Sequence, residues 1–252
     1  MNERVPGFVD SSSCCRPIRA RLDFSALRHN FSVARAYGKD AKLWAVIKAD
    51  AYGHGQFAAA RALDGLADGY ALLESEVAVA LREQGYRQPI LLLEGFFAPE
   101  EVARIVRYDL TPVIHCRNQL EMLAATPTRP AHVYLKFNTG MNRLGFDPQD
   151  ASEVRQHLER LGIRQITLMT HFAGADTGDG FEAQLDAARQ LVDRFSSPWS
   201  FANSAALMKY PESLGVGSWA RPGIMLYGGS PFGATPGQTA AELGLSPVMT
   251  LE

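Results

Sequence analysis

Short, almost continuous hydrophobic runs recur along the chain and alternate with segments that have a helical pattern. Strands in which apolar and polar residues alternate are typical of sheets with one solvent-exposed face, whereas continuous runs are typical of parallel strands covered on both faces. The pattern therefore predicts eight buried parallel strands. They are Leu43–Ile47, Gly69–Leu73, Pro89–Leu93, Thr111–Ile114, His132–Phe137, Gln165–Met169, Trp199–Ala202 and Gly223–Tyr227.

The segments between these runs carry the periodicity of amphipathic helices. Near the N-terminus, Asp23 precedes a segment in which Leu27 and Phe31 share one face, and an aspartate at such a place caps a helix. Pro99 suits the first turn of a later helix, where its missing amide hydrogen is not needed. Two further apolar faces at helical spacing are Val154, Leu158 and Leu161, and Phe181, Leu185, Ala188, Leu191, Val192 and Phe195.

A strand and a helix repeated eight times predict a (β/α)8 TIM barrel, with a doubly wound open sheet as the alternative. We expect the barrel to span residues 18–228. Residues 1–17 are predicted to form a disordered N-terminal tail. Residues 229–252 begin with a Gly- and Pro-rich stretch and end in another apolar run, so we expect a linker and the truncated start of a second domain.

Composition and charge narrow the classes of function. The 252 residues are 46% hydrophobic and carry a formal net charge of −2, which gives no general attraction to nucleic acid or anionic membranes. No stretch has the roughly 20 apolar residues of a membrane span, and the N-terminus lacks a secretory signal. The three cysteines have no CxxC spacing, which argues against structural zinc and favours a reducing compartment. We expect a cytoplasmic protein that binds no metal.

Lys48 is the first candidate for chemistry, because it lies where a predicted buried strand opens into a glycine-containing loop. The run AVIK is followed directly by ADAYGHG. A lysine after three apolar residues is costly to desolvate, so its pKa should fall toward that of a nucleophilic neutral amine, which suits Schiff-base chemistry. The structural alternative is a lysine that simply reaches the surface in the loop.

Nearly all of the further candidate residues fall at the carboxyl ends of the later strands, where the active site of a barrel forms, although Arg221 lies just before the eighth predicted strand. Each has a structural alternative when taken alone, namely a core histidine, a surface ion pair or a helix cap, but together they predict one site. Loops after the seventh and eighth strands commonly bind phosphate, and a serine hydroxyl beside backbone amides suits an anion. The residues are Lys136, Arg143, His171, Asn203, Ser204, Arg221 and Gly223.

Five motifs resemble, in the same order, those of bacterial alanine racemases: AVIKADAYGHG, LKFNTGMNRLGF, THFAGAD, ANSAAL and RPGIMLYG. The resemblance extends from about Pro17 to the last residue. It implies a fold-type III barrel that binds pyridoxal 5'-phosphate, interconversion of L-alanine and D-alanine, and a homodimer in the full-length protein. The D-alanine would supply peptidoglycan, or the reaction would serve alanine catabolism.

The resemblance also implies a role for each matched residue. Lys48 would hold the cofactor as a Schiff base and act as the base for the α-proton of D-alanine. Arg221, hydrogen-bonded to His171, would face the pyridine nitrogen, and Arg143 would lie near the phenolic oxygen and the substrate. Lys136 corresponds to a lysine that is carbamylated in some members. The cofactor phosphate would be bound by Tyr52, Ser204, Gly223 and Ile224, with Asn203 and Tyr227 close by.

Members of the family also have a β-rich second domain, which supplies the other catalytic base, a tyrosine, to the partner subunit. We expect no residue of this chain to take that role, so that the chain binds pyridoxal phosphate but racemises alanine weakly or not at all. Two alternatives stay open. One is a single-domain barrel that binds and buffers pyridoxal phosphate without turnover, and the other is a racemase of serine or of a broader set of amino acids.

Overall fold

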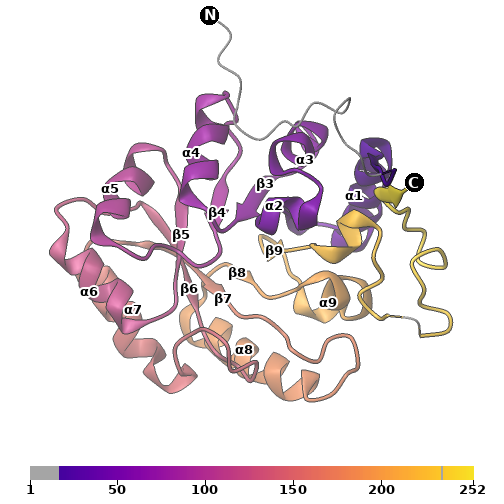
Figure 1. Cartoon of the computed structure of the whole chain (residues 1–252). Helices are drawn as coiled ribbons and strands as arrows, with labels where there is room; N and C mark the ends of the chain where they lie inside the picture. The colour runs from indigo at the N-terminus through magenta and orange to yellow at the C-terminus, as the bar shows by residue number, and fades with distance from the viewer. Residues whose placement is uncertain (1–16, 234) are drawn as a thin grey trace, which may run out of the picture.

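Eight parallel strands form the centre of the molecule in the computed structural model, which describes residues 17–233 and 235–252. They follow one another in the order β8-β7-β6-β5-β4-β3-β2-β9. Next to the two edge strands, the amide of Arg221 donates to the carbonyl oxygen of Ala202 at 2.8 Å, so the sheet is a nearly closed barrel (Figure 1). The TIM-barrel prediction is confirmed, and the open sheet is wrong. The strands are β2 Lys42–Val46, β3 Gly69–Leu72, β4 Ile90–Leu92, β5 Thr111–Ile114, β6 His132–Lys136, β7 Gln165–Met169, β8 Trp199–Ser200 and β9 Trp219–Ala220.

Helices surround the strands and bury the apolar faces that the sequence pattern predicts. The side chain of Asp23 accepts the amides of Ser25 and Ala26 at the start of α1, and Pro99 is the first residue of α5. Phe181, Leu185, Ala188 and Leu191 are buried along α8. The helices are α1 Phe24–Gly38, α2 Lys48–Gly53, α3 Gln56–Leu63, α4 Ser75–Glu83, α5 Pro99–Arg107, α6 Arg117–Ala125, α7 Ala151–Arg160, α8 Phe181–Phe195 and α9 Ser204–Lys209, with 3-10 helices η2 Pro148–Asp150, η3 Pro211–Ser213 and η4 Ile224–Tyr227.

The eighth strand does not lie where the sequence analysis predicts it. The run Gly223–Tyr227 is not a strand but contains the 3-10 helix η4, and the barrel is completed by β9 a few residues earlier. Just before this run, the carbonyl oxygen of Pro222 still accepts the amide of Val46 in β2, at 3.3 Å. A short apolar run between glycines has no periodicity that separates a strand from a buried helical turn, which explains the error.

The interior of the barrel is filled by a cluster of its own, separate from the larger apolar layer between strands and helices. The rings of Trp44 and Trp219 stack with centroids 4.1 Å apart, and Tyr134 meets Trp44 edge-on at 6.0 Å. The indole Nε1 of Trp44 donates to the hydroxyl of Tyr134 at 3.2 Å. We call this the inner cluster: Trp44, Val46, Ala71, Leu91, Val113, Tyr134 and Met169, with Trp219 packed against it.

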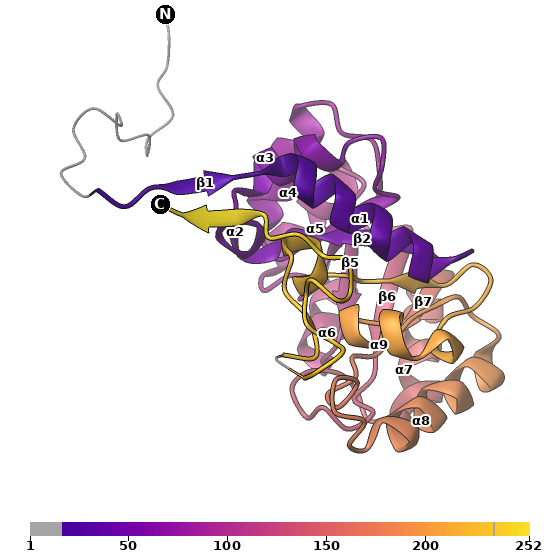
Figure 2. The ribbon, with the colours of Figure 1, turned by 90° about the vertical axis from the view of Figure 1, so that its right-hand side faces the viewer.

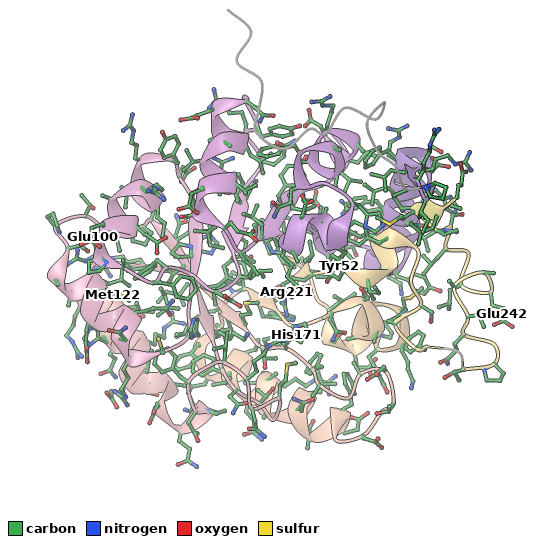
Figure 3. All side chains as sticks on the ribbon, in the orientation of Figure 1. Tyr52, Glu100, Met122, His171, Arg221 and Glu242 are labelled. Atoms are coloured by element: carbon green, nitrogen blue, oxygen red, sulfur yellow. The ribbon has the colours of Figure 1, made fainter. Side chains whose placement is uncertain are left out.

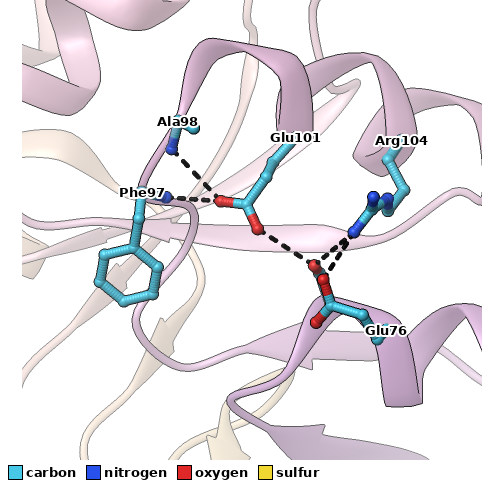
Figure 4. Close-up of polar contacts among 6 residues, drawn as sticks. Glu76, Phe97, Ala98, Glu101 and Arg104 are labelled. Carbon is cyan, nitrogen blue, oxygen red and sulfur yellow. Dashed lines mark hydrogen bonds and ion pairs between the residues drawn. The ribbon is translucent and has the colours of Figure 1, made fainter.

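Polar contacts brace the loop between β4 and α5, at the mouth of the barrel (Figure 4). Glu101 of α5 reaches back and accepts the amides of Phe97 and Ala98, at 2.6 and 3.3 Å. Arg104 of α5 donates to Glu76 of α4 at 2.8 Å. An exposed pair of this kind contributes little stability by itself, but the bonds from Glu101 satisfy the free amides that precede the helix. The loop is thereby fixed in place.

The described N-terminal and C-terminal segments pair with each other outside the barrel (Figure 2). β1 (Ala20–Leu22) and β10 (Met249–Leu251) form an antiparallel two-stranded sheet. Asn30 ties the chain before β10 to the barrel, because its side chain donates to the carbonyl oxygens of Leu226 and Ser246 at 3.0 and 2.8 Å. Residues 1–16 of the predicted tail lie outside the described residues. Across the part of the chain that is described, no helix combines the length and the hydrophobicity needed to span a bilayer.

Candidate active site

A cavity of about 380 Å³ opens at the carboxyl ends of the barrel strands. Tyr52, His171 and Arg221 come from distant parts of the chain and lie in the same central region of the molecule (Figure 3). The floor of the cavity includes Val46 and Met169 of the inner cluster. Ten residues that the sequence analysis selects line this one cavity: Lys48, Tyr52, Lys136, Arg143, His171, Asn203, Ser204, Arg221, Gly223 and Ile224.

Lys48 begins a turn with an unusual backbone. It follows β2 closely, but the residues after it do not form the glycine-rich loop that the sequence suggests. Ala49, Asp50, Ala51 and Tyr52 have φ values of 52°, 51°, 54° and 55°, which make one left-handed helical turn without a glycine. This conformation costs about 1–2 kcal/mol per L-residue. The turn brings Tyr52 back to the cavity that Lys48 lines.

The environment of Lys48 favours the neutral amine. Burial lowers the pKa of its ammonium group most, and the positive charges of Arg143 and Arg221 lower it further. Glu94 acts in the opposite direction. A neutral amine is the form that attacks a carbonyl, so this environment favours Lys48 as a nucleophile.

Arg221 is the most deeply buried charge in the cavity wall, with 4% of its surface exposed. Its Nη2 donates to the carbonyl oxygens of Thr170 and Phe201, at 2.6 and 3.2 Å, and its Nη1 donates to the hydroxyl of Ser200 at 2.6 Å. Burial lowers the pKa of Arg221 to about 10, so the guanidinium remains protonated at neutral pH. These bonds fix both its charge and its orientation.

His171 lies beside this guanidinium and is neutral. Its Nδ1 accepts a hydrogen bond from Nη2 of Arg221 at 3.3 Å. Burial, and then the positive charge of Arg221, hold the pKa of His171 well below its usual value. The imidazole can therefore accept from Arg221 without competing for a positive charge of its own.

Lys136 and Arg143 come from β6 and from the turn that follows it. Lys136 is 5% exposed, and burial together with the charges of Arg221 and Arg143 lowers its pKa to about 8. Arg143, in contrast, is solvent-exposed at the rim. A substantial fraction of Lys136 is therefore neutral near pH 8, inside a cavity that is rich in positive charge.

The loops after β8 and β9 line one part of the cavity together. The hydroxyl of Ser204 accepts the amide of Gly223 at 2.9 Å. A Cβ atom on Gly223 would lie 2.4 Å from the hydroxyl oxygen of Tyr52, so a larger residue there would displace the Tyr52 side chain. Asn203 caps α9, because its side chain accepts the amide of Ala206 at 3.0 Å. Two hydroxyls and an amide are thus gathered within one small region, as an anion requires.

Tyr227 differs from the other selected residues because it is not among the residues that line the cavity. Its ring lies behind Tyr52, with centroids 4.8 Å apart, and its hydroxyl donates to the carbonyl oxygen of Val46 at 2.9 Å. A direct contact with a ligand in the cavity is therefore not available to it in this arrangement.

Glu94 lines the cavity and is missing from the residues selected by sequence. It immediately follows the predicted strand Pro89–Leu93, as in the run LLLE, so a search for polar residues after every strand would have found it. Its carbonyl oxygen accepts Nε2 of His115 at 3.1 Å and Nε2 of Gln119 at 2.9 Å, which holds the residue firmly. Glu94 and Asp176 are the two carboxylates among the lining residues, against four cationic side chains.

Comparison with known proteins agrees with this fold. Residues 22–231 match the family described as alanine racemase, N-terminal domain. The alanine racemases of Nitrosomonas eutropha and Sodalis glossinidius are 49% and 45% identical to the chain, which covers 66% of the length of each, with 94% of this chain aligned. The chain thus spans just under two thirds of these curated relatives.

Solved structures give the same result. The crystal structure of the biosynthetic alanine racemase from Pseudomonas aeruginosa has a TM-score of 0.87 and 41% identity, over 94% of this chain and 66% of that one. The alanine racemase from Acinetobacter baumannii has a TM-score of 0.85 and 33% identity, over the same shares of the two chains. By sequence and by fold, the chain belongs to the alanine racemase family, whose N-terminal domain it matches.

Proposed function

We propose that the protein interconverts L-alanine and D-alanine with pyridoxal 5'-phosphate, which Lys48 holds covalently. The observation that carries this proposal is that a lysine with a lowered pKa and the cluster of Tyr52, Ser204 and Gly223 line the same cavity. The relatives named alanine racemase support the choice of substrate. We place the reaction in the cytoplasm, as a source of D-alanine for peptidoglycan or as a step of alanine catabolism.

The residues present fit this cofactor. Pyridoxal phosphate has an aldehyde, which needs a nucleophilic amine, and a phosphate, which needs several donors at a matching distance from it. Lys48 provides the amine, while Tyr52, Ser204 and the backbone at Gly223 and Ile224 provide the phosphate end. A side chain at position 223 would crowd the hydroxyl of Tyr52, and glycine is expected where backbone approaches a ligand closely.

Pyridoxal phosphate, when bound, supplies an electron-withdrawing ring that acidifies the α-proton of an attached amino acid. Lys48 is the group of this chain that removes or returns that proton on one face of the α-carbon. Racemisation also needs an acid or base on the opposite face. We propose that this role is taken, in a homodimer, by a tyrosine of the partner subunit's second domain, as the family resemblance implies, and not by a residue of this chain.

Arg221 determines which outcome the site favours. Because its guanidinium stays protonated at neutral pH, it presents only donors to the cofactor ring and takes no proton from it. A guanidinium facing the pyridine nitrogen of a bound cofactor would keep that nitrogen unprotonated, and the ring would then withdraw electrons less strongly. This favours return of the proton to the α-carbon over transamination. His171 keeps Arg221 oriented through the bond to its Nδ1.

Lys136 and Arg143 are the remaining two cationic residues of the cavity with a proposed role. Arg143 is placed to bind the anionic oxygen of the cofactor ring and the carboxylate of the substrate. The pKa of Lys136, about 8, leaves neutral amine available to add carbon dioxide, with loss of one proton, to give a carbamate. The resulting negative charge would orient the guanidinium of Arg143.

The proposal is tested by trapping the lysine. The protein is incubated with pyridoxal phosphate, reduced with borohydride and digested, and the labelled peptide is identified by mass spectrometry. We expect the label on Lys48, no label in Lys48→Ala, and an unchanged position of the label in the matched variant Lys136→Met. A label on another lysine, or none in the wild-type chain, would show that the site is assigned wrongly.

A second measurement identifies the reaction. With pyridoxal phosphate bound, the protein should exchange the α-proton of alanine for deuterium, while this chain alone should form the opposite enantiomer weakly or not at all. Serine offered under the same conditions tests the choice of substrate. Labelling of Lys48 without any exchange would instead support a barrel that binds the cofactor and does not turn over amino acids.

A further inference from the structure

The left-handed turn after Lys48 is a conformation that its own residues do not favour. Ala49, Asp50, Ala51 and Tyr52 all carry side chains, and all four lie at positive φ. A backbone of this kind persists only where the surrounding structure holds it, and such strain is often found at functional sites. The contacts that hold this turn therefore also determine where Lys48 and Tyr52 point.

Hydrogen bonds within the segment close the turn at its end. The Nδ1 of His54 donates to the carbonyl oxygens of Ala51 and Tyr52, at 3.0 and 3.1 Å. The amide of Gly55 donates to the carbonyl oxygen of Asp50 at 2.9 Å. These bonds are local, so they shape the turn but do not fix it to the barrel.

Tyr227 connects the turn to the barrel on both sides of Lys48. Before the lysine, its hydroxyl donates to the carbonyl oxygen of Val46 at 2.9 Å. After the lysine, its ring stacks on Tyr52 with centroids 4.8 Å apart and lies 4.7 Å from the ring of His54. The side chain is 6% exposed and belongs to η4, the helix that begins just after Gly223.

We propose that Tyr227 is a positioning residue, which holds the left-handed turn and so sets the places of Lys48 and Tyr52 from outside the cavity. The inference rests on the proposed function for its consequence, since these two residues are there assigned to the aldehyde and the phosphate of one cofactor. One side chain thus contacts the strand end before Lys48, at Val46, and the turn after it, at Tyr52.

Two substitutions separate the contributions of the ring and the hydroxyl. Tyr227→Phe keeps both ring contacts and leaves the buried carbonyl oxygen of Val46 without this donor. Tyr227→Leu removes the ring contacts as well. The matched control is Tyr70→Phe, because Tyr70 is fully buried and its hydroxyl also donates to a backbone carbonyl, that of Ala60 at 3.0 Å, away from the cavity.

The first readout is hydrogen–deuterium exchange of the chain without cofactor. In Tyr227→Phe we expect amides of residues 48–55 to exchange about fivefold faster, the effect of one lost hydrogen bond, and in Tyr227→Leu more than ~10-fold faster. Tyr70→Phe should leave these amides unchanged while losing comparable thermal stability. Equal exchange at residues 48–55 in all three variants, or an equal rise over the whole chain, would overturn the inference.

The second readout is the dissociation constant for pyridoxal phosphate. We expect it to rise about fivefold in Tyr227→Phe and more in Tyr227→Leu, with the borohydride label still on Lys48. If the wild-type chain shows no label on Lys48, the proposed function fails, whatever the exchange data are. If the label is on Lys48 and the dissociation constants of both variants equal that of Tyr70→Phe, the proposed function stands and the positioning role is wrong.

Discussion

The barrel interior has two halves that differ in packing and charge: a lower half, which is the inner cluster, and an upper half, which is the cavity at the carboxyl ends of the strands. In the lower half, the inner cluster packs Trp44, Trp219 and Tyr134 against one another, and the indole of Trp44 finds a partner in the hydroxyl of Tyr134. In the upper half, four cationic side chains line a cavity with two carboxylates. The lower half is filled and satisfied, while the upper half is hollow and carries excess positive charge.

This difference teaches where stability and function reside. Like charges brought together in a partly buried space destabilise the folded chain and shift the pKa values of their neighbours. Here burial and the arginines lower the pKa of Lys48, Lys136 and His171. An arrangement of this kind persists only on a well-packed support, which the inner cluster supplies. Substitutions should therefore lower activity in the upper half and lower stability in the lower half.

The largest effect is expected for Lys48→Ala in the upper half. Exchange of the α-proton of alanine for deuterium should fall by about 10⁴-fold, the upper range for a positioned acid–base group. The free energy of unfolding should not fall, because a partly buried charge is removed from a positive cavity. Lys39→Ala, at the exposed end of α1, serves as the control and should keep full activity. If Lys48→Ala keeps activity within tenfold of the wild type, the upper half does not carry the activity in the way proposed.

In the lower half, Trp44→Ala should give the largest loss of stability. Trp44 is 1% exposed and contacts two aromatic neighbours, so its removal leaves a large cavity in the barrel. The free energy of unfolding should fall by roughly 3–5 kcal/mol, measured by urea denaturation without cofactor. Trp44→Phe, which refills most of the space, should lose clearly less. An equal loss for both variants would mean that packing is not the cause.

The sequence predicts this division only in part. Seven strands were located because their hydrophobic runs are continuous, and the polar residues after them converge because parallel strands end at one mouth. The left-handed turn at Ala49–Tyr52 gave no signal, because none of its residues is a glycine and tertiary contacts such as those of Tyr227 hold it. The same contacts hold the ring of Tyr227 behind Tyr52, so Tyr227 is not among the residues that line the cavity.

The charge in the upper half should make stability depend on pH through Lys136. Its pKa is about 8 in the folded chain, against an ordinary value of 10.5. Between these values the unfolded chain binds more protons than the folded one, so the free energy of unfolding rises with pH. Lys136→Met lacks this contribution. It should be more stable than the wild type by about 1–3 kcal/mol at pH 7, and the advantage should shrink toward pH 10.

Urea denaturation of both chains at several pH values between 7 and 10 measures this difference. Lys39→Met is the matched control, since Lys39 is exposed and its replacement should give a difference from the wild type that does not vary with pH. If the free energy of unfolding of Lys136→Met exceeds that of the wild type by the same amount at every pH, burial of the Lys136 charge is not what destabilises the wild type.

The smallest effect is expected for Tyr134→Phe, which tests how separate the two halves are. The substitution keeps the ring in the inner cluster and removes only the hydroxyl that accepts Nε1 of Trp44. The free energy of unfolding should fall by about 1–2 kcal/mol, because the indole N–H loses its partner in a buried place. The dissociation constant for pyridoxal phosphate should stay within about twofold, the range of changes away from a site. Burial already raises the pKa of Tyr134, so its hydroxyl is neutral at physiological pH and its loss removes no charge from beneath Arg221. A larger change in cofactor binding would mean that the floor orients Arg221 directly, and that packing and charge in this barrel are coupled.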